Sequence, residues 1–348
     1  SDPAAISTDP CISKHGGEQP GQERWAMVFR RFVPNGNTYT ISMRRAVFDA
    51  GLNTIASDGP LGGPAPDSLV SVSPLTDFVG GTRRFLAVFS GQGTAGGGGD
   101  IYGVLFGENG QLLESAQNLT EIESGDPTFR ARSQWGPVVD TDGCRFVIVY
   151  RDQYTHTDSD VRIFTIAHEP AVLPYHWSLH DRSTLGSSFD PERNPILLAP
   201  RIAARPHRYL VGMTLENAAA TQWTTVLRLY DGMRSTGGFS SRATGCGGLN
   251  LAASGEPALG APFRIETTNA LGLAGLFVGV ASSTAIAACP GCILGTSIFA
   301  TLPTPSTLIV PCDPALVGGA IAMQGFDTAQ AACLGLVRLS NTIDVVIR

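Results

Sequence analysis

Several polar residues in this sequence have types and spacings that could do chemistry. His176 and His180 stand four residues apart in HWSLH, and His168 lies nearby. Two such histidines on a helix could bind zinc. However, Pro170 and Pro174 oppose a helix here, and on a strand the two side chains would lie roughly 13 Å apart, too far to bind one ion. We therefore interpret them as surface or sheet-edge histidines.

Three groups of carboxylates could bind calcium or supply the acid pair of a glycosidase. Asp152, Asp158 and Asp160 lack the order of a helix–loop–helix calcium site, and we expect Asp160 to cap a hairpin turn. Asp140-Thr-Asp-Gly143 and Asp190-Pro-Glu-Arg193 place acids on expected loops, but nothing makes two of them face each other. We expect no catalytic residue, no metal site and no cofactor. Structural calcium is left open without a supporting motif.

Signatures of other enzyme classes are absent from the sequence. No G-x-S-x-G surrounds Ser90, Ser235 or Ser240. There is no P-loop and no dinucleotide fingerprint, and the glycine-rich stretch 93–100 is expected to be a hairpin turn between two strands. We therefore predict a protein that is not an enzyme.

The cysteines cluster toward the C-terminus. Cys289 and Cys292 have metal-ligand spacing in CPGC, but no second such pair follows them. Disulfides in an exported protein are the favoured interpretation, with the pairing left open. The candidate disulfide cysteines are Cys246, Cys289, Cys292, Cys312 and Cys333. With Cys11 and Cys144 the total is seven, so at least one thiol is free or bonds outside the chain.

The sequence contains four copies of the strand–turn–strand pattern that would position these residues. Each copy has an apolar run, a polar or glycine-rich turn and a second, alternating run. The copies open with an Arg–aromatic pair at spacings of 60, 61 and 63 residues: Arg24-Trp25, Arg84-Phe85, Arg145-Phe146 and Arg208-Tyr209. We expect the aromatic side chains to fill a core between repeats and the arginines to pair at an edge. A ring of sugar-binding aromatics is the alternative.

Two weaker strands complete each repeat. First strands are expected at 68–73, 136–143 and 200–206, with DPCISKHGG (9–17) in the same place ahead of the first copy. Fourth strands are expected at 52–56, 112–118 and 175–180. Four antiparallel strands in about 60 residues predict a blade of a β-propeller. We favour a closed ring without fixing the number of blades.

We divide the chain into a propeller at 1–245, with a polar tail at 1–10, and a β-sandwich at 246–348. Strands of the second domain are expected at 249–254, 262–268, 306–311, 319–326 and 342–348. The run 271–288 is apolar enough for a membrane helix, with Gly275 and Gly279 in a GxxxG spacing. Its Gly, Ser and Thr content and its lack of basic flanks disfavour a membrane span.

Composition limits the function. The chain has 348 residues, 43% apolar and 16% charged, which indicates a folded protein. A net charge of −6 argues against a nucleic-acid partner. Lys14 is the single lysine, and no charged residue lies between Thr267 and Cys312. The chain begins Ser-Asp-Pro, as a processed, exported protein could.

The segments RFLAVFSGQ and DIYGVLFGENG, followed by WGPVVDTDGCRFVIVY, resemble the propeller-type repeats of large exported proteins in planctomycetes and similar environmental bacteria. The tail CGGLNLAAS, CPGCILG and LSNTIDVVIR is similar to their C-terminal domain. Only the second copy has DIYG; the others have TYTI, DVRI and WTTV there. The resemblance implies export and a β-rich fold, and it assigns no catalytic residue.

These observations favour a secreted or cell-surface structural protein that associates with itself in a filament or layer. The uncharged C-terminal stretch and the missing catalytic motifs motivate this hypothesis. The first alternative is a module that binds an extracellular glycan or a protein on the loop face of the propeller. The second is a secreted carbohydrate-active enzyme.

Overall fold

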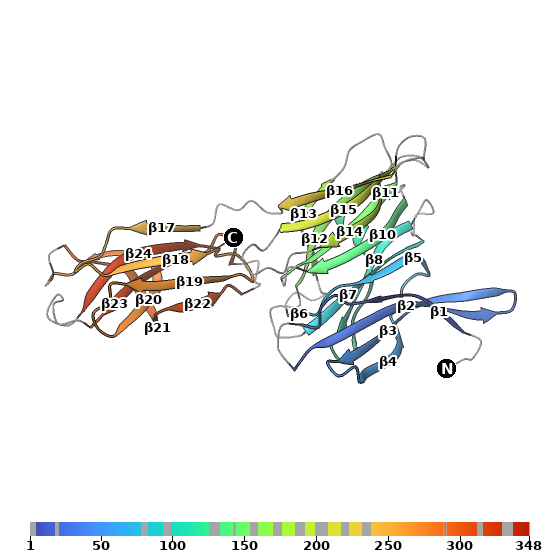
Figure 1. Cartoon of the computed structure of the whole chain (residues 1–348), viewed down its shortest axis with the longest axis horizontal. Helices are drawn as coiled ribbons and strands as arrows, with labels where there is room; N and C mark the ends of the chain where they lie inside the picture. Colours follow the sequence, from blue (N-terminus) through green and yellow to red (C-terminus); the bar gives the residue numbers. More distant parts are fainter. Residues whose placement is uncertain are drawn as a thin grey trace. The chain divides into compact units, whose positions relative to one another are not determined.

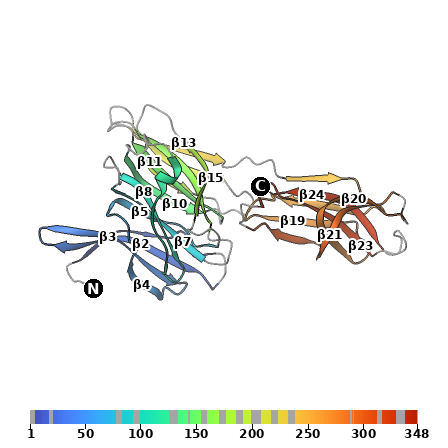
Figure 2. The same cartoon turned by 180° about the vertical axis from the view of Figure 1, so that it is seen from behind.

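The computed structural model confirms an all-β chain, with one short helix among the described residues. It divides into two compact units, one of Ser1–Arg201 with His207–Met233 and one of Ile202–Pro206 with Arg234–Arg348. Figures 1 and 2 label the strands of each unit. The described residues are 5–17, 21–77, 83–92, 99–124, 133–141, 144–153, 159–169, 176–184, 192–198, 208–216, 223–231, 238–287, 289, 291–311, 316–328 and 337–347.

Four antiparallel sheets follow one another in the N-terminal unit. The first has β1 (Ile6–Ile12), β2 (Arg24–Asn35), β3 (Thr38–Asp49) and β4 (Thr54–Pro60). The second has β5 (Pro66–Val72), β6 (Thr76–Asp77), β7 (Arg83–Gln92), β8 (Gly99–Gly107) and β9 (Leu112–Asn118), followed by α1 (Leu119–Ser124). The third has β10 (Ser133–Thr141), β11 (Phe146–Gln153), β12 (Ser159–Glu169) and β13 (His176–Thr184). The fourth has β14 (Glu192–Leu198), β15 (Arg208–Glu216) and β16 (Trp223–Asp231).

Hydrophobic cores lie between consecutive sheets. Phe85 is buried between the first and second sheets, Phe146 between the second and third, and Tyr209 between the third and fourth. The prediction that the repeated aromatics fill these cores is therefore confirmed for Phe85, Phe146 and Tyr209, whereas Trp25 is only partly buried and belongs to none of these cores. Arg84 and Arg145 are each only 2% exposed, so the expected position at an edge is wrong for these two arginines. Alternate residues of a strand point to opposite faces, and here both faces are covered.

The first strands of three sheets approach one another. The Val139 amide of β10 donates to Ser71 Oγ of β5 at 3.2 Å. Lys14, just after β1, donates to Asp140 Oδ2 of β10 at 2.6 Å. The lone lysine thus links the first and third sheets. No sheet among the described residues closes on itself.

The first strand of the fourth sheet is not where the sequence places it. The expected strand at 200–206 lies outside the described residues, and the strand that pairs with β15 is β14. Its register shifts between Arg193 and Ile196, around Pro195. Proline has no N–H, so it is tolerated at such a bulge in an edge strand. In the first sheet, β1 confirms the expected strand and takes up part of the polar tail at 1–10.

The C-terminal unit holds a five-stranded sheet, ordered β17-β24-β23-β20-β21, and a three-stranded sheet, ordered β18-β19-β22. Their bounds are β17 (Gly238–Arg242), β18 (Asn250–Gly255), β19 (Pro262–Thr268), β20 (Ala274–Ala285), β21 (Ile293–Pro303), β22 (Ser306–Ile309), β23 (Ala320–Asp327) and β24 (Arg338–Val346). All five predicted strands are present within a few residues. Strand β17, which precedes the expected boundary at 245/246, pairs with β24 of this unit.

The apolar run 271–288 contains strand β20, between β21 and β23. Its glycines allow close packing: a Cβ added to Gly275 would lie 2.5 Å from the Phe326 ring, and one added to Gly279 would lie 1.4 Å from the Ser297 carbonyl oxygen. The GxxxG spacing therefore serves a sheet. Among the described residues, no helix is long and apolar enough to cross a membrane.

Cys246 and Cys292 form a disulfide, and Cys289 is also disulfide-bonded. The disulfide interpretation of CPGC is therefore confirmed for these three cysteines. Cys144 is disulfide-bonded, and Cys11 is a free cysteine, as the odd total predicted. The remaining candidates, Cys312 and Cys333, lie outside the described residues.

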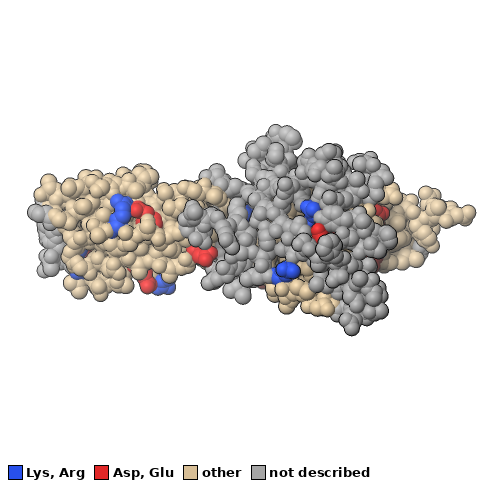
Figure 3. Space-filling view, turned by 90° about the horizontal axis from the view of Figure 1, so that it is seen from above, with Lys and Arg blue, Asp and Glu red and all other residues tan. Residues whose placement is uncertain are grey.

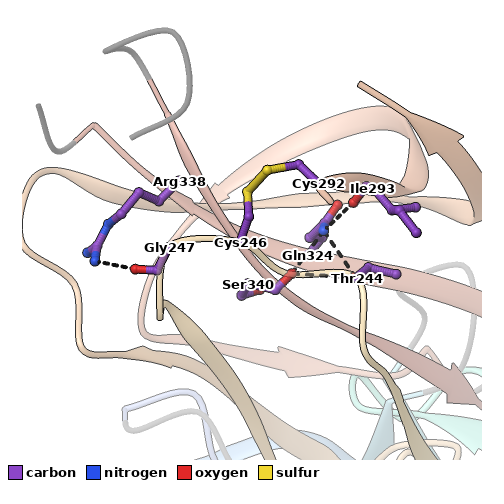
Figure 4. The surroundings of a disulfide bond; sticks show 8 residues. All are labelled: Thr244, Cys246, Gly247, Cys292, Ile293, Gln324, Arg338 and Ser340. Atoms are coloured by element: carbon purple, nitrogen blue, oxygen red, sulfur yellow. Dashed lines mark hydrogen bonds between the residues drawn. A yellow bond between two sulfur atoms is a disulfide. The ribbon is translucent and has the colours of Figure 1, made fainter. Parts of the chain in front are cut away.

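A buried amide lies beside this disulfide (Figure 4). Gln324 is fully buried, and its Nε2 lies 2.9 Å from the Ser340 carbonyl oxygen, 3.0 Å from that of Ile293 and 3.2 Å from Thr244 Oγ1. Its Oε1 accepts a hydrogen bond from the Gly295 amide at 2.9 Å. One side chain thus joins β23 to β21, β24 and the segment before the disulfide.

Candidate functional site

The β2–β3 hairpin of the first sheet projects beyond the other strands of its unit in both views (Figures 1 and 2). Its strands pair from Arg24 and Asp49 at the base to Asn35 and Thr38 at the tip. The two-residue turn begins at Gly36, whose φ of +61° suits glycine at this position. The turn lies within PNGN (34–37) and confirms the polar turn expected between the two runs of the first copy, with strand pairing up to its tip.

The two halves of this hairpin have different surroundings. Near the base, Ala26 and Val28 are fully buried against the second sheet, together with Val47 of β3. Every second residue of these two strands lies on the same face, and this face continues outward beyond the core. Figure 3 shows no charged side chain at the far tip on the face in view, and residues 33–41 contain none. The distal half therefore presents an uncharged surface.

Apolar side chains line up on this distal half. Ile6 of β1 pairs with Phe32 of β2, which pairs with Ile41 of β3, and Pro34 pairs with Tyr39 in the next row. Directly opposed residues share a face of a sheet. Ile6 is 55% exposed and Tyr39 is 57% exposed. The Phe32 and Tyr39 rings lie edge to face, with centroids 6.3 Å apart. We call these five residues the hairpin platform.

A polar pair borders the platform. Arg30 lies one row inward, with its Cζ 5.5 Å from the centroid of the Phe32 ring. Its Nε donates to Asp9 Oδ2 at 2.9 Å, and its Nη2 bonds the same oxygen. Thr8 Oγ1 also donates to Asp9 Oδ2, at 2.8 Å. The hydrogen bonds from Arg30 and Thr8 hold the pKa of Asp9 below its usual range.

The opposite face of the hairpin is charged. Arg44 Nε donates to Asp58 Oδ1 at 2.6 Å, and Arg31 bonds the other carboxylate oxygen. Burial acts to raise the pKa of Asp58, but the hydrogen bonds and charges of Arg44 and Arg31 outweigh it and the pKa is lowered. The hairpin thus has one face of paired charges and one apolar, aromatic face.

Among the described residues, the carboxylates considered from the sequence do not form an open acid pair. Asp152 and Asp160 are cross-strand partners, and both are buried. Asp152 forms an ion pair with Arg162 at 2.8 Å, and Asp140 forms its own with Lys14. Within the described ranges, no group of three or more His, Cys, Asp or Glu residues could hold a metal ion. Outside those ranges lie Asp142, Asp158 and Asp190.

The remaining candidates have ordinary positions. His176 and His180 lie on β13, as expected for a strand, and His168 lies on β12. The glycine-rich turn is not described, but Gln92 and Gly99 on either side of it are paired, which confirms the hairpin. None of these residues belongs to the platform.

Sequence reasoning missed the platform. The signal available to it was the pair of aromatic residues, Phe32 and Tyr39, on either side of the predicted PNGN turn. No sequence motif indicates that Asp9 lies beside the platform, because its position depends on a register shift between Thr8 and Cys11 in the β1–β2 pair. That bulge, with Asp9 at a φ of +52°, brings the carboxylate to Arg30.

No family model and no curated protein matches the chain. Among solved structures it is similar to an α-L-arabinanase of Penicillium chrysogenum complexed with arabinobiose, at 12% identity and a TM-score of 0.41, covering 97% of this chain and 92% of that one. It is also similar to the GH93 α-L-arabinofuranosidase of Fusarium graminearum, at 10% identity and a TM-score of 0.39, covering 99% and 93%. An endo-arabinase of Bacteroides thetaiotaomicron has 13% identity and a TM-score of 0.34, covering 63% and 74%.

The prediction of a non-catalytic subunit of a filament or layer is contradicted by this comparison. The three proteins named above act on carbohydrates, and the alternative hypothesis of a carbohydrate-directed protein is the closer one. At these identities and TM-scores the likeness transfers no residue and no activity to this chain.

Proposed function

We propose that this chain is an exported protein that binds a glycan through the hairpin platform. Its N-terminal sheets would be blades of a β-propeller, which the meander order and the approach of the first strands support. The Cys246–Cys292 disulfide supports an oxidising compartment. Closure of the ring and the resemblance to exported propeller-repeat proteins stay predictions.

The exposed aromatic surface carries the proposal. A sugar ring has one face of C–H groups, and this face packs well against an aromatic or aliphatic surface. More than half of the Tyr39 surface is exposed to solvent, and its ring contacts the Phe32 ring edge to face. The β1–β2 and β2–β3 pairings hold the backbone of the platform in place, so binding costs little conformational entropy.

We propose binding without cleavage. A glycosidase needs two carboxyl groups on either side of the scissile bond. Around the platform, the described carboxylates are Asp9, bound by Arg30, and Asp58 on the opposite face. The buried pair Asp152 and Asp160 belongs to another sheet. Incubation of the protein with any glycan that it binds is therefore expected to release no reducing ends.

Replacing Tyr39 with Ala tests the proposal. Loss of the stacked ring is expected to weaken glycan binding about tenfold, which corresponds to about 1.4 kcal/mol. Affinity electrophoresis in gels that contain soluble arabinan, xylan, mannan or polygalacturonate would measure it. Wild-type protein is expected to be retarded by at least one of these polymers.

The matched control is Leu227→Ala, which removes another exposed apolar side chain, 63% exposed, from β16 of the same unit. This variant should migrate like the wild type. Equal retardation of the wild type and Tyr39→Ala would contradict the platform as the binding site. No retardation of the wild type by any polymer would contradict glycan binding itself.

A further inference from the structure

Asp9 has an unusual backbone next to the platform. Its φ of +52° is a left-handed conformation that costs free energy for most side chains and that Asp and Asn tolerate best. The register shift between Thr8 and Cys11 places it there. Such strain persists where the surrounding structure holds it, and it is frequent at ligand sites. Here its result is a carboxylate fixed beside Phe32 by Arg30.

The bonds of this pair leave one acceptor and one donor unused among the described residues. Thr8 Oγ1, Arg30 Nε and Arg30 Nη2 all bond Asp9 Oδ2. No described group bonds Asp9 Oδ1 or Arg30 Nη1. The Asp9 and Arg30 side chains are 29% and 19% exposed, so neither is closed off from a bound molecule.

This inference rests on the proposed function. We propose that the platform selects a neutral glycan and that Asp9 and Arg30 form hydrogen bonds with two adjacent hydroxyl groups of one sugar. One hydroxyl donates to Asp9 Oδ1, and the oxygen of its neighbour accepts from Arg30 Nη1. Charge-assisted hydrogen bonds of this kind are stronger than neutral ones. The sugar's C–H face would lie on Phe32 and Tyr39.

The charges beside the platform favour a neutral ligand. Asp9 compensates Arg30, and the tip at 33–41 has no charged residue. A sugar carboxylate at this edge would meet the Asp9 carboxylate at the moment when it reached Arg30. Like charges in a partly desolvated site repel, so an acidic glycan is disfavoured. Removal of the Asp9 charge should reverse this preference.

The test is Asp9→Asn, which keeps the size of the side chain and its tolerance of the left-handed backbone. Binding of neutral xylo- and arabino-oligosaccharides and of galacturonate oligosaccharides is measured by isothermal titration calorimetry. The wild type is expected to favour one neutral oligosaccharide over galacturonate by about tenfold or more. In Asp9→Asn the neutral affinity should fall about tenfold and the galacturonate affinity should rise, with a new dependence on salt.

The matched control is Asp58→Asn, which removes the same charge beside Arg44 and Arg31 on the opposite face. It should leave the ratio of neutral to acidic binding unchanged, and thermal unfolding should verify that both variants fold. An unchanged ratio in Asp9→Asn, or a wild type that prefers galacturonate, would overturn this inference. If Tyr39→Ala still loses binding, the proposed function survives that result. If the wild type binds neither class, both proposals fail.

Discussion

Replacement of Gln324 with Leu is expected to destabilise the C-terminal unit by about 3 to 5 kcal/mol. Leu has nearly the same volume but makes no hydrogen bonds. The Gly295 amide and the Ile293 carbonyl oxygen would lose this partner in a buried region, and the Ser340 carbonyl oxygen would keep only a 3.5 Å hydrogen bond from Thr244 Oγ1. Each buried polar group left without a partner costs about 1 to 3 kcal/mol. Hydrogen exchange of amides in β23 and β24, measured peptide by peptide, reports the stability of this unit.

Asn250→Leu is the control for this prediction. It replaces a similar amide on the exposed surface of the same unit, where the side chain makes only a 3.5 Å contact with Thr268. The expected change is within about 0.5 kcal/mol. If Gln324→Leu were as stable as this control, the buried amide would be only a space-filling group.

Replacement of both Cys246 and Cys292 with Ser is expected to cost about 4 kcal/mol of stability. The disulfide spans a sequence separation of 46 residues. In the chain-entropy description, the free energy from constraining the unfolded chain grows with the logarithm of that loop, which gives about 4 kcal/mol here. Thermal unfolding, compared between the wild type and the double variant, would measure the effect.

Cys11→Ser is the matched control, because Cys11 is a free cysteine of the other unit. Its replacement should change stability by about 1 kcal/mol or less, since the side chain is only partly buried. A double variant that unfolds at the same temperature as the wild type would mean that the surrounding strands hold this region without the covalent link.

Strand position was the most predictable part of the fold. The repeated Arg–aromatic openings located the second strand of each sheet, because a buried strand needs a continuous apolar run. Strand β14 was not predicted because it contains Pro195, and proline usually disfavours a strand. In the structure a bulge accommodates this proline. The run at 271–288 hid β20, because Gly275 and Gly279 gave it the composition of a packed helix while serving close contacts in a sheet.

The candidate site was less predictable than the strands. Its rows depend on the pairing of Ile6 with Phe32 and Ile41, which joins segments that no local pattern connects. The exposed state of Tyr39 depends on the hairpin extending past its neighbouring sheet, which strand length alone does not reveal. The burial of Arg84 was equally hidden, because an arginine at the start of a strand reads as an exposed residue.

The most direct test of glycan binding at the platform is a ring-proton NMR titration. Protein with labelled tyrosine and phenylalanine is titrated with the polymer fragment that binds most tightly. We predict that the Tyr39 and Phe32 ring signals, assigned through Tyr39→Ala and Phe32→Leu, shift and saturate with the Kd measured by calorimetry. Saturable binding that leaves both ring signals unshifted and shifts other aromatic signals instead would contradict glycan binding at the platform.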